Sequence, residues 1–234
     1  MLDYWLALSV ANKIGLSTKH KLLRYFGSPV KIFEEKIRKI DFSGIKEDID
    51  LKAAKDKYLK TAQIIMKRCE DENAEIICFD DENYPKLLKE TNAPPLILYC
   101  KGDKKILSQR SVAIVGTREP NSNGKKDTEM ISSGLTKSGF VIASGLARGV
   151  DTVAHDSVVN AGGKTIAVMA TGINKIYPVQ NIELAKRITG GGGALITEQR
   201  PDEMPFAPNF AQRNRIISGI SECTIIVSAP EKSG

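Results

Sequence analysis

The second half of the chain alternates short apolar runs with longer segments in which apolar residues recur at helical spacing. The apolar runs predict β-strands at 111–115, 140–143, 165–170, 194–197 and 224–228. The segments between them predict helices at 125–137, 151–161, 182–188 and 210–220. Strands that are apolar throughout are typical of a parallel sheet buried on both faces. With right-handed crossovers, this pattern predicts an α/β fold with a doubly wound parallel sheet.

The first 70 or so residues read differently, as lysine-rich helices. We expect one helix over 1–15, a second over 19–27, a third over 30–40 and a longer one over 51–69. Pairs of short helices joined by Ile-Gly or Phe-Gly turns resemble helix–hairpin–helix or sterile-alpha-motif modules. Such a module either binds the nucleic-acid backbone through the amides of its turns, or only packs against the rest of the protein or binds a partner. The sequence leaves both options open.

Residues 74–110 join the two parts, with strand candidates at 74–80 and 96–102 separated by Asn-Tyr-Pro and Ala-Pro-Pro breakers. We take this segment as an extension that leads into the α/β region. The predicted organisation is therefore a small helical domain over 1–72 and an α/β domain over 73–234. A strand followed by a Gly/Ser turn ordinarily leads into another helix, so we expect the fold to continue beyond Gly234.

The stretch SVAIVGTREPNSNG, at 111–124, carries the clearest chemical signal. A strand runs into Gly116, Thr117 and Arg118, and a helical pattern opens near Gly124. Strand, glycine turn and helix N-terminus together form an anion site, because free N–H groups and the helix dipole point at the ligand. The arginine on the turn adds a fixed guanidinium fork suited to phosphate.

Two common phosphate motifs do not match this turn. A P-loop needs Gly-Lys-[Ser/Thr] at the end of its glycine loop, whereas Gly124-Lys125 is followed by Lys126. A dinucleotide fingerprint needs G-x-G-x-x-G and an acid after the second strand, whereas that strand ends in Ser144-Gly145. The sequence therefore indicates an anion-binding α/β domain that is neither a P-loop NTPase nor an NAD enzyme.

The ends of the predicted strands show no base beside a nucleophile. His155 follows Asp151 by four residues on a predicted helix, a spacing typical of a hydrogen bond along one helix face. Arg213 and Arg215 project about 200° apart on a helix. We therefore expect one of them to reach the strand ends, while the other pairs with a carboxylate such as Glu198 or Asp151. The alternative is a structural salt bridge for both.

Composition narrows the class of protein only modestly. The formal net charge of +6 suits a polyanionic partner such as nucleic acid. The four cysteines are scattered without a C-x-x-C pair, so neither a zinc site nor a disulfide framework is expected. Cys78 and Cys223 lie in apolar runs, and we expect both in the core. No apolar run reaches the roughly 18 residues of a membrane span. We expect a cytoplasmic protein with no membrane association.

Several strings together resemble the DprA/Smf family of bacterial DNA-processing proteins. They are SVAIVGTR, ASGLARGVDTVAHDSVVNAGGKTIAVMATGINKIYP, ALITE, FAQRNRIISGIS and the closing SG, in the order and spacing of the family. The resemblance covers about 111–234, and the helical N-terminal region fits the sterile-alpha-motif-like domain of many members. It implies an extended Rossmann-like fold that forms a homodimer.

The resemblance also implies a function. Members bind single-stranded DNA that enters the competent cell during natural transformation, protect it and help to load the RecA recombinase for DNA recombination. Binding uses a phosphate pocket at the strand ends, with no catalysis, no cofactor and no metal. By position, Arg118 is expected to contact phosphate, and Phe210 is an aromatic that can stack on a base. The expected DNA-binding residues are Gly116, Thr117, Arg118, Ser144, Gly145, Arg148, Gly149, Gly172, Phe210, Arg213, Asn214 and Arg215.

The sequence departs from the family pattern at one point and leaves alternatives. Some relatives carry a lysine just before the Phe210 position, where this chain has Ala207-Pro208. A different class is a Rossmann-type nucleoside-monophosphate phosphoribohydrolase, whose P-G-G-x-G-T-x-x-E loop has no counterpart after the last strand. A third reading is a RecA-adaptor scaffold without direct DNA contact, against which the arginine-bearing turn argues.

Overall fold

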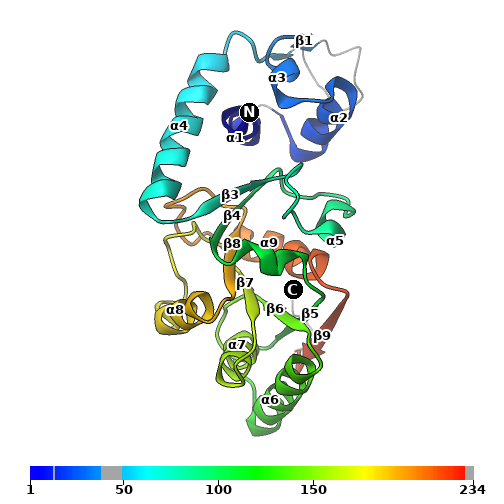
Figure 1. The fold of residues 1–234 in the computed structure, drawn as a ribbon, viewed down its shortest axis with the longest axis vertical. Helices are drawn as coiled ribbons and strands as arrows, with labels where there is room; N and C mark the ends of the chain where they lie inside the picture. Colours follow the sequence, from blue (N-terminus) through cyan, green and yellow to red (C-terminus); the bar gives the residue numbers. More distant parts are fainter. Residues whose placement is uncertain (13, 38–48, 230–234) are drawn as a thin grey trace.

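The computed structural model describes residues 1–12, 14–37 and 49–229. Its N-terminal part, at the top of Figure 1, contains α1 (Leu2–Val10), α2 (Leu16–Phe26), α3 (Pro29–Ile32) and α4 (Lys55–Asp71). A two-stranded antiparallel pair, β1 (Lys36–Ile37) and β2 (Ile49–Asp50), lies between α3 and α4 in the chain. Gly27 ends α2 in the left-handed conformation, with a φ of 74°.

Two of the predicted N-terminal boundaries are wrong. The first helix ends at Val10, and Gly15 caps the N-terminus of α2. The helix expected over 30–40 ends at Ile32, because the chain turns there to pair β1 with β2, and Lys36 lies opposite Asp50. Residues 38–40 of that predicted helix lie outside the described residues.

A seven-stranded sheet forms the second part. It contains β3 (Glu75–Cys78), β4 (Ile97–Gly102), β5 (Ser111–Gly116), β6 (Val141–Ser144), β7 (Thr165–Val168), β8 (Ala194–Thr197) and β9 (Cys223–Val227), in the order β3-β4-β8-β7-β6-β5-β9. The five strands from β5 to β9 are parallel, as predicted. The sheet as a whole is mixed, because β3 and β4 add to its β8 side in antiparallel pairing. The α/β class and the Rossmann-like arrangement are confirmed.

Helices cover both faces of the sheet. On one face, α7 (Val150–Asn160) packs between α6 (Ser122–Lys137) and α8 (Ile182–Gly190). After β8 the chain crosses back to form β9 beside β5, and α9 (Ala207–Gly219) packs on the other face with the short α5 (Lys86–Lys89). The 3₁₀ helices η2 (Lys104–Ser108) and η3 (Val179–Asn181) lie in the connections between these elements. The strand order therefore reverses between β5 and β9, which is where doubly wound sheets bind ligands.

Alternate residues of each central strand enter different apolar clusters. Ala113 and Ala143 face α9, whereas Val112, Ile114 and Ile142 face α7. A third cluster continues from the sheet residues Tyr99 and Leu195 into α1 and α4 of the helical part. The helical part thus shares a continuous core with the sheet, and the division at residues 72 and 73 remains a prediction.

The last strand lies at the edge of the sheet. Its residues are mostly exposed, including Ile226 at 64% and Cys223, whereas Cys78 is buried as expected. The expectation of a core position for Cys223 was wrong, because β9 pairs only with β5 among the strands that the structure describes. No helix in the described part of the chain is long and apolar enough to span a membrane.

Candidate functional site

The turns that follow β5 and β6 touch one another at the switch point. The N–H of Val150 donates to the carbonyl oxygen of Thr117 at 3.1 Å. Gly149, at a φ of +77°, packs so closely that an added Cβ would lie 2.3 Å from that same oxygen. Glycine is required here both for the left-handed backbone and for the close approach. This contact brings Arg118 and Arg148, which are 30 residues apart in the sequence, to one rim.

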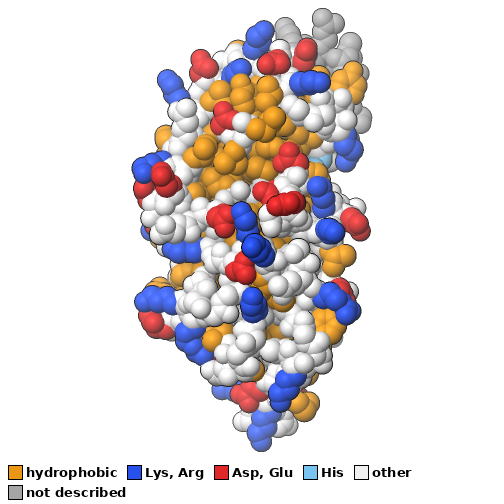
Figure 2. All heavy atoms as spheres, in the orientation of Figure 1, with side chains coloured by type: hydrophobic (Ala, Val, Ile, Leu, Met, Phe, Trp, Pro, Cys, Tyr) orange, Lys and Arg blue, Asp and Glu red, His pale blue; other side chains and the backbone are white. Residues whose placement is uncertain are grey.

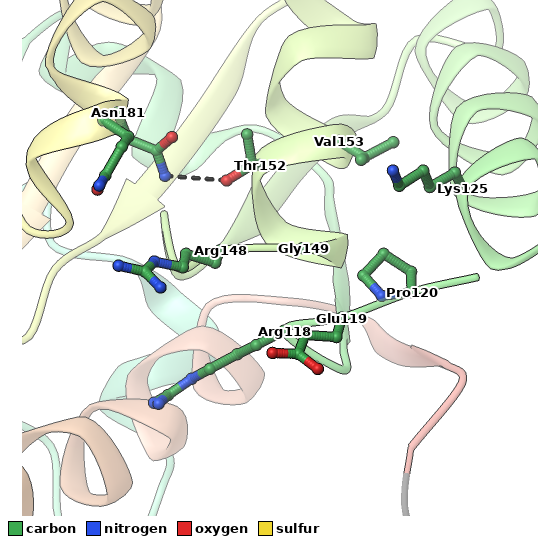
Figure 3. Close-up of a pocket in the computed structure, with 10 residues that line it drawn as sticks. Arg118, Glu119, Pro120, Lys125, Arg148, Gly149, Thr152, Val153 and Asn181 are labelled. Atoms are coloured by element: carbon green, nitrogen blue, oxygen red, sulfur yellow. Dashed lines mark hydrogen bonds between the residues drawn. The ribbon is translucent and has the colours of Figure 1, made fainter. Parts of the chain in front are cut away.

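A pocket of about 580 Å³ opens beside this contact, and we call it the cationic pocket. Arg118, Arg148 and Lys125 are exposed, and none of the three forms an ion pair with a carboxylate of the described residues. Figure 3 shows both arginines extending in the same direction from neighbouring turns, with Lys125 across the pocket on α6. Its lining residues are Arg118, Glu119, Pro120, Lys125, Arg148, Gly149, Thr152, Val153, Gln180 and Asn181.

The electrostatics of the cationic pocket favour an anion. Helix α7 starts beside it at Gly149, with no side-chain hydrogen bond capping its N-terminus. The partial positive charge of that helix end adds to the three cationic side chains. Figure 2 shows Lys/Arg and Asp/Glu side chains interspersed on the face that it displays, with hydrophobic groups gathered over the N-terminal helices. The face shown in Figure 2 is therefore not uniformly basic.

A second cleft, of about 790 Å³, lies between α9 and β9 and shares Arg118 with the cationic pocket. We call it the α9 cleft. Phe210 contributes an aromatic ring to it, and Ile217 and Ile226 contribute apolar surface. Of the predicted DNA-binding residues, Gly116, Thr117, Arg118, Phe210, Arg213, Asn214 and Arg215 line this cleft.

Arg213 reaches the strand ends but is 5% exposed. Its guanidinium donates to the carbonyl oxygens of Gly145 and Val168, at 2.5 Å each. Burial lowers the pKa of Arg213, and the nearby Asp151 acts in the opposite direction. Glycine at 145 leaves room for this guanidinium, since an added Cβ would lie 2.0 Å from Nη1. The space expected above Gly145 for a DNA backbone is thus filled by the protein's own arginine.

The Asp151 carboxylate holds the turn after β6 through hydrogen bonds to its backbone. It accepts from the N–H groups of Gly145 (3.1 Å) and Ala147 (3.3 Å). Burial raises the pKa of Asp151, while the charge of Arg213 and the backbone donors counteract that rise. These contacts give the carboxylate a positioning task within the protein.

Arg215 points away from Arg213, as the helical spacing predicted. It pairs with Glu198 and donates to the carbonyl oxygen of Ala93 at 2.6 Å. Burial raises the pKa of Glu198, and Arg215 counteracts that rise. Asn214, between the two arginines, is exposed. Within Arg213-Asn214-Arg215, Arg213 therefore lies at the strand ends, Asn214 lies at the surface and Arg215 forms an ion pair.

Three other expected residues lie outside both cavities. Ser144 and Gly145 are buried, and the Ser144 hydroxyl donates to the carbonyl oxygen of Ile114 at 2.6 Å. Gly172 packs against the loop after β8, so that an added Cβ would lie 2.6 Å from the carbonyl oxygen of Arg200. Their placement gives them roles in shaping the turns, and it offers no direct route to a ligand.

His155 does not bond Asp151, contrary to the helix-face expectation. It is fully buried, and its Nδ1 lies 2.7 Å from the hydroxyl of Thr165. Because that hydroxyl donates onward to the carbonyl oxygen of Ile142, it accepts from His155. Burial lowers the pKa of His155 to about 3.

The structure adds residues that the sequence did not single out. Lys125 lies on the first turn of α6. In the sequence it was considered only as part of Gly124-Lys125-Lys126, which does not match a P-loop. Asn181 donates to the Thr152 hydroxyl and to the Leu146 carbonyl oxygen, at 2.9 Å each. Tyr177 contacts Phe210 edge to face. Asn181 and Tyr177 follow β7 within one loop, and no local motif signals that this loop folds over the site.

These features define an α/β protein with a cluster of cations, not ion-paired to any described carboxylate, at the switch point of a doubly wound sheet. Comparison with known proteins supplies the family. The family model for DNA recombination-mediator protein A matches residues 75–234. Protein Smf of Synechocystis is 41% identical over 169 residues, covering 70% of this chain and 42% of that protein. DNA processing protein DprA of Bacillus subtilis is 41% identical over 159 residues, covering 68% and 53%.

The chain belongs to the DprA/Smf family, and two solved structures agree with that assignment. DprA of Streptococcus pneumoniae matches with a TM-score of 0.79 and 30% identity, covering 100% of this chain and 80% of that one. DprA of Helicobacter pylori, described for its single-stranded DNA binding mode, matches with a TM-score of 0.62 and 36% identity, covering 68% and 71%. The chain spans about half the length of the two curated relatives above.

Proposed function

We propose that this protein binds single-stranded DNA, and that it acts in DNA processing during natural transformation. The observation that carries the proposal is the rim with Arg118 and Arg148, both free of carboxylate partners among the described residues, and the adjoining α9 cleft, which Arg118 shares and to which Phe210 contributes an aromatic ring. Single-strand binders combine a cationic path for phosphates with aromatic rings on which bases stack. The DNA-binding relative from Helicobacter pylori supports the same choice of ligand.

The finer parts of the proposal come from the family. The protein protects incoming strands in the cytoplasm, forms a homodimer and helps to load RecA. The direct contacts are assigned to Arg118, Arg148 and Phe210, with Gly149 and the Thr117 turn presenting backbone. Arg213, Ser144, Gly145 and Gly172 shape those turns from within, in keeping with their burial.

We further propose that the site binds without catalysing a reaction. Among the described residues at the rim, Asp151 is committed to two backbone amides and Glu198 to Arg215. Glu119 also lines the cationic pocket, which the sequence did not lead us to expect, but no histidine, cysteine or lysine base is hydrogen-bonded to it among those residues. A phosphoribohydrolase would instead release adenine from adenosine monophosphate, whereas a protein that only binds DNA would not.

The test is an affinity measurement with single-stranded and duplex oligonucleotides. Arg118→Ala removes one charge-assisted phosphate contact, which is worth about 1.5–3 kcal/mol, so single-strand affinity should fall tenfold or more. It should also reduce the slope of log affinity against log salt by about 0.7. Lys186→Ala is the matched control, since Lys186 is an exposed cation on α8 paired with Glu183. Equal affinities of Arg118→Ala and the wild type would refute the assignment, and adenine release would favour the enzyme.

A further inference from the structure

Tyr177 and Phe210 form an aromatic pair at the α9 cleft, and Tyr177 is the more exposed of the two rings. Tyr177 is 47% exposed, and its ring meets Phe210 edge to face, with centroids 5.5 Å apart and an interplanar angle of 70°. Phe210 lines the α9 cleft, and Gln180, three residues after Tyr177, lines the cationic pocket. Phe210 therefore places the pair at the α9 cleft, and the chain from Tyr177 to Gln180 leads to the cationic pocket.

The loop that carries Tyr177 is held in place before any ligand arrives. The N–H of Gly172 donates to the carbonyl oxygen of Glu203 at 2.8 Å. The side-chain amide of Asn174 donates to the Asp202 carboxylate and accepts from the Asp202 N–H. Across the start of the loop, the Thr197 hydroxyl donates to the carbonyl oxygen of Thr171 at 2.8 Å. These bonds hold the backbone at the start of the loop, so that this part of the loop loses little freedom on binding, which favours affinity.

We infer that Tyr177 is a base-stacking residue, which works with Phe210 to hold a base next to the phosphate in the cationic pocket. The inference deepens the proposed function and rests on it. In an edge-to-face pair one ring covers only part of the other, so the exposed part of Tyr177 offers a flat apolar surface. A single strand alternates phosphate and base, which matches a cationic pocket followed by an aromatic surface.

The alternative for Tyr177 is a structural cap that only covers Phe210 and the start of α9. The two roles differ in what they require of the ligand. A stacking contact needs a base, whereas a structural cap affects any strand equally through the shape of the site. An abasic strand, which keeps every phosphate, therefore separates the two roles.

The experiment measures the affinity of the full chain for an oligothymidylate of about 16 nucleotides, near one site size, and for an abasic strand of equal length. We expect Tyr177→Ala to weaken binding of the base-bearing strand by about 5- to 150-fold, the contribution of one base–aromatic stack. Tyr177→Phe should bind within twofold of the wild type, because it keeps the flat ring. On the abasic strand, wild type and Tyr177→Ala should bind equally.

Two further variants complete the design. Tyr177→Leu keeps apolar bulk without a flat ring and should behave as Tyr177→Ala does, while Val179→Ala changes an exposed neighbour and should behave as wild type. Arg118→Ala in the same assay should lose affinity for both strands, and failure of the wild type to bind either strand would overturn the proposed function. Stacking by Tyr177 is refuted if Tyr177→Ala binds the base-bearing strand as wild type does, or loses affinity equally on both strands.

Discussion

Replacing Gly145 with alanine tests whether Arg213 is an internal part of the site. The added Cβ would lie 2.0 Å from Nη1 of Arg213, 2.4 Å from Cζ and 2.5 Å from Nη2. No Cβ tolerates such contacts, and the guanidinium is buried, so it must leave its position. The backbone at Gly145 is not in the left-handed region, so the alanine itself brings no conformational penalty.

The size of the effect follows from what the displaced guanidinium loses. Its hydrogen bonds to the carbonyl oxygens of Gly145 and Val168 are both charge-assisted and short. Bonds to charged groups contribute about 1.5–3 kcal/mol each, so loss of both costs about 3–6 kcal/mol. Domains of this kind are stable by roughly 5–15 kcal/mol, so Gly145→Ala should remove a large part of the free energy of unfolding.

Chemical denaturation followed by far-ultraviolet circular dichroism measures this loss. Gly134→Ala is the matched control, because Gly134 lies inside α6 with nothing within 4 Å of an added Cβ. Alanine there should be neutral or should stabilise the protein by up to about 1 kcal/mol. In an Arg213→Ala background, Gly145→Ala should cost much less, since the clashing group is absent. A loss below about 1 kcal/mol for Gly145→Ala in the wild-type background would refute the placement of Arg213.

Two predictions concern pH. Burial raises the pKa of Asp151 above its unfolded value of about 3.9, so stability falls as pH rises from about 4 through the folded pKa. Arg213→Ala removes the positive charge that opposes this rise in pKa. As pH rises over that range, the free energy of unfolding of Arg213→Ala should therefore fall relative to that of the double variant Arg213→Ala/Asp151→Asn. Parallel pH profiles of the two variants in urea melts would contradict this. The pKa of His155 is lowered to about 3, so the unfolded chain binds its proton first and stability rises with pH up to about 6.5. Wild type should therefore lose about 2 kcal/mol more than His155→Asn between pH 7 and pH 5, and equal losses would show that His155 is not buried and neutral.

Much of the sheet could be predicted from local pattern alone. The apolar run at 194–197 has the same bounds as β8, and the other four central strands were placed within about two residues. The predictions failed where long-range pairing decides the outcome. The helix expected beyond Ile32 gave way to the β1–β2 pair. Cys223 is exposed because, within the described part of the chain, its strand pairs with β5 alone.

The α/β class and the turn that carries Arg118 could be predicted from the amino-acid sequence, because apolar periodicity and glycine turns are local properties of the chain. What each candidate residue contacts depends on how the distant parts of the chain pack together. Arg213 and Arg215 are two residues apart, yet one is buried on backbone carbonyls and the other pairs with Glu198. Likewise, Tyr177 reaches Phe210 because two loops from different strands meet. Such contacts join residues far apart in the chain, and they depend on the order and register of strands that no local motif encodes.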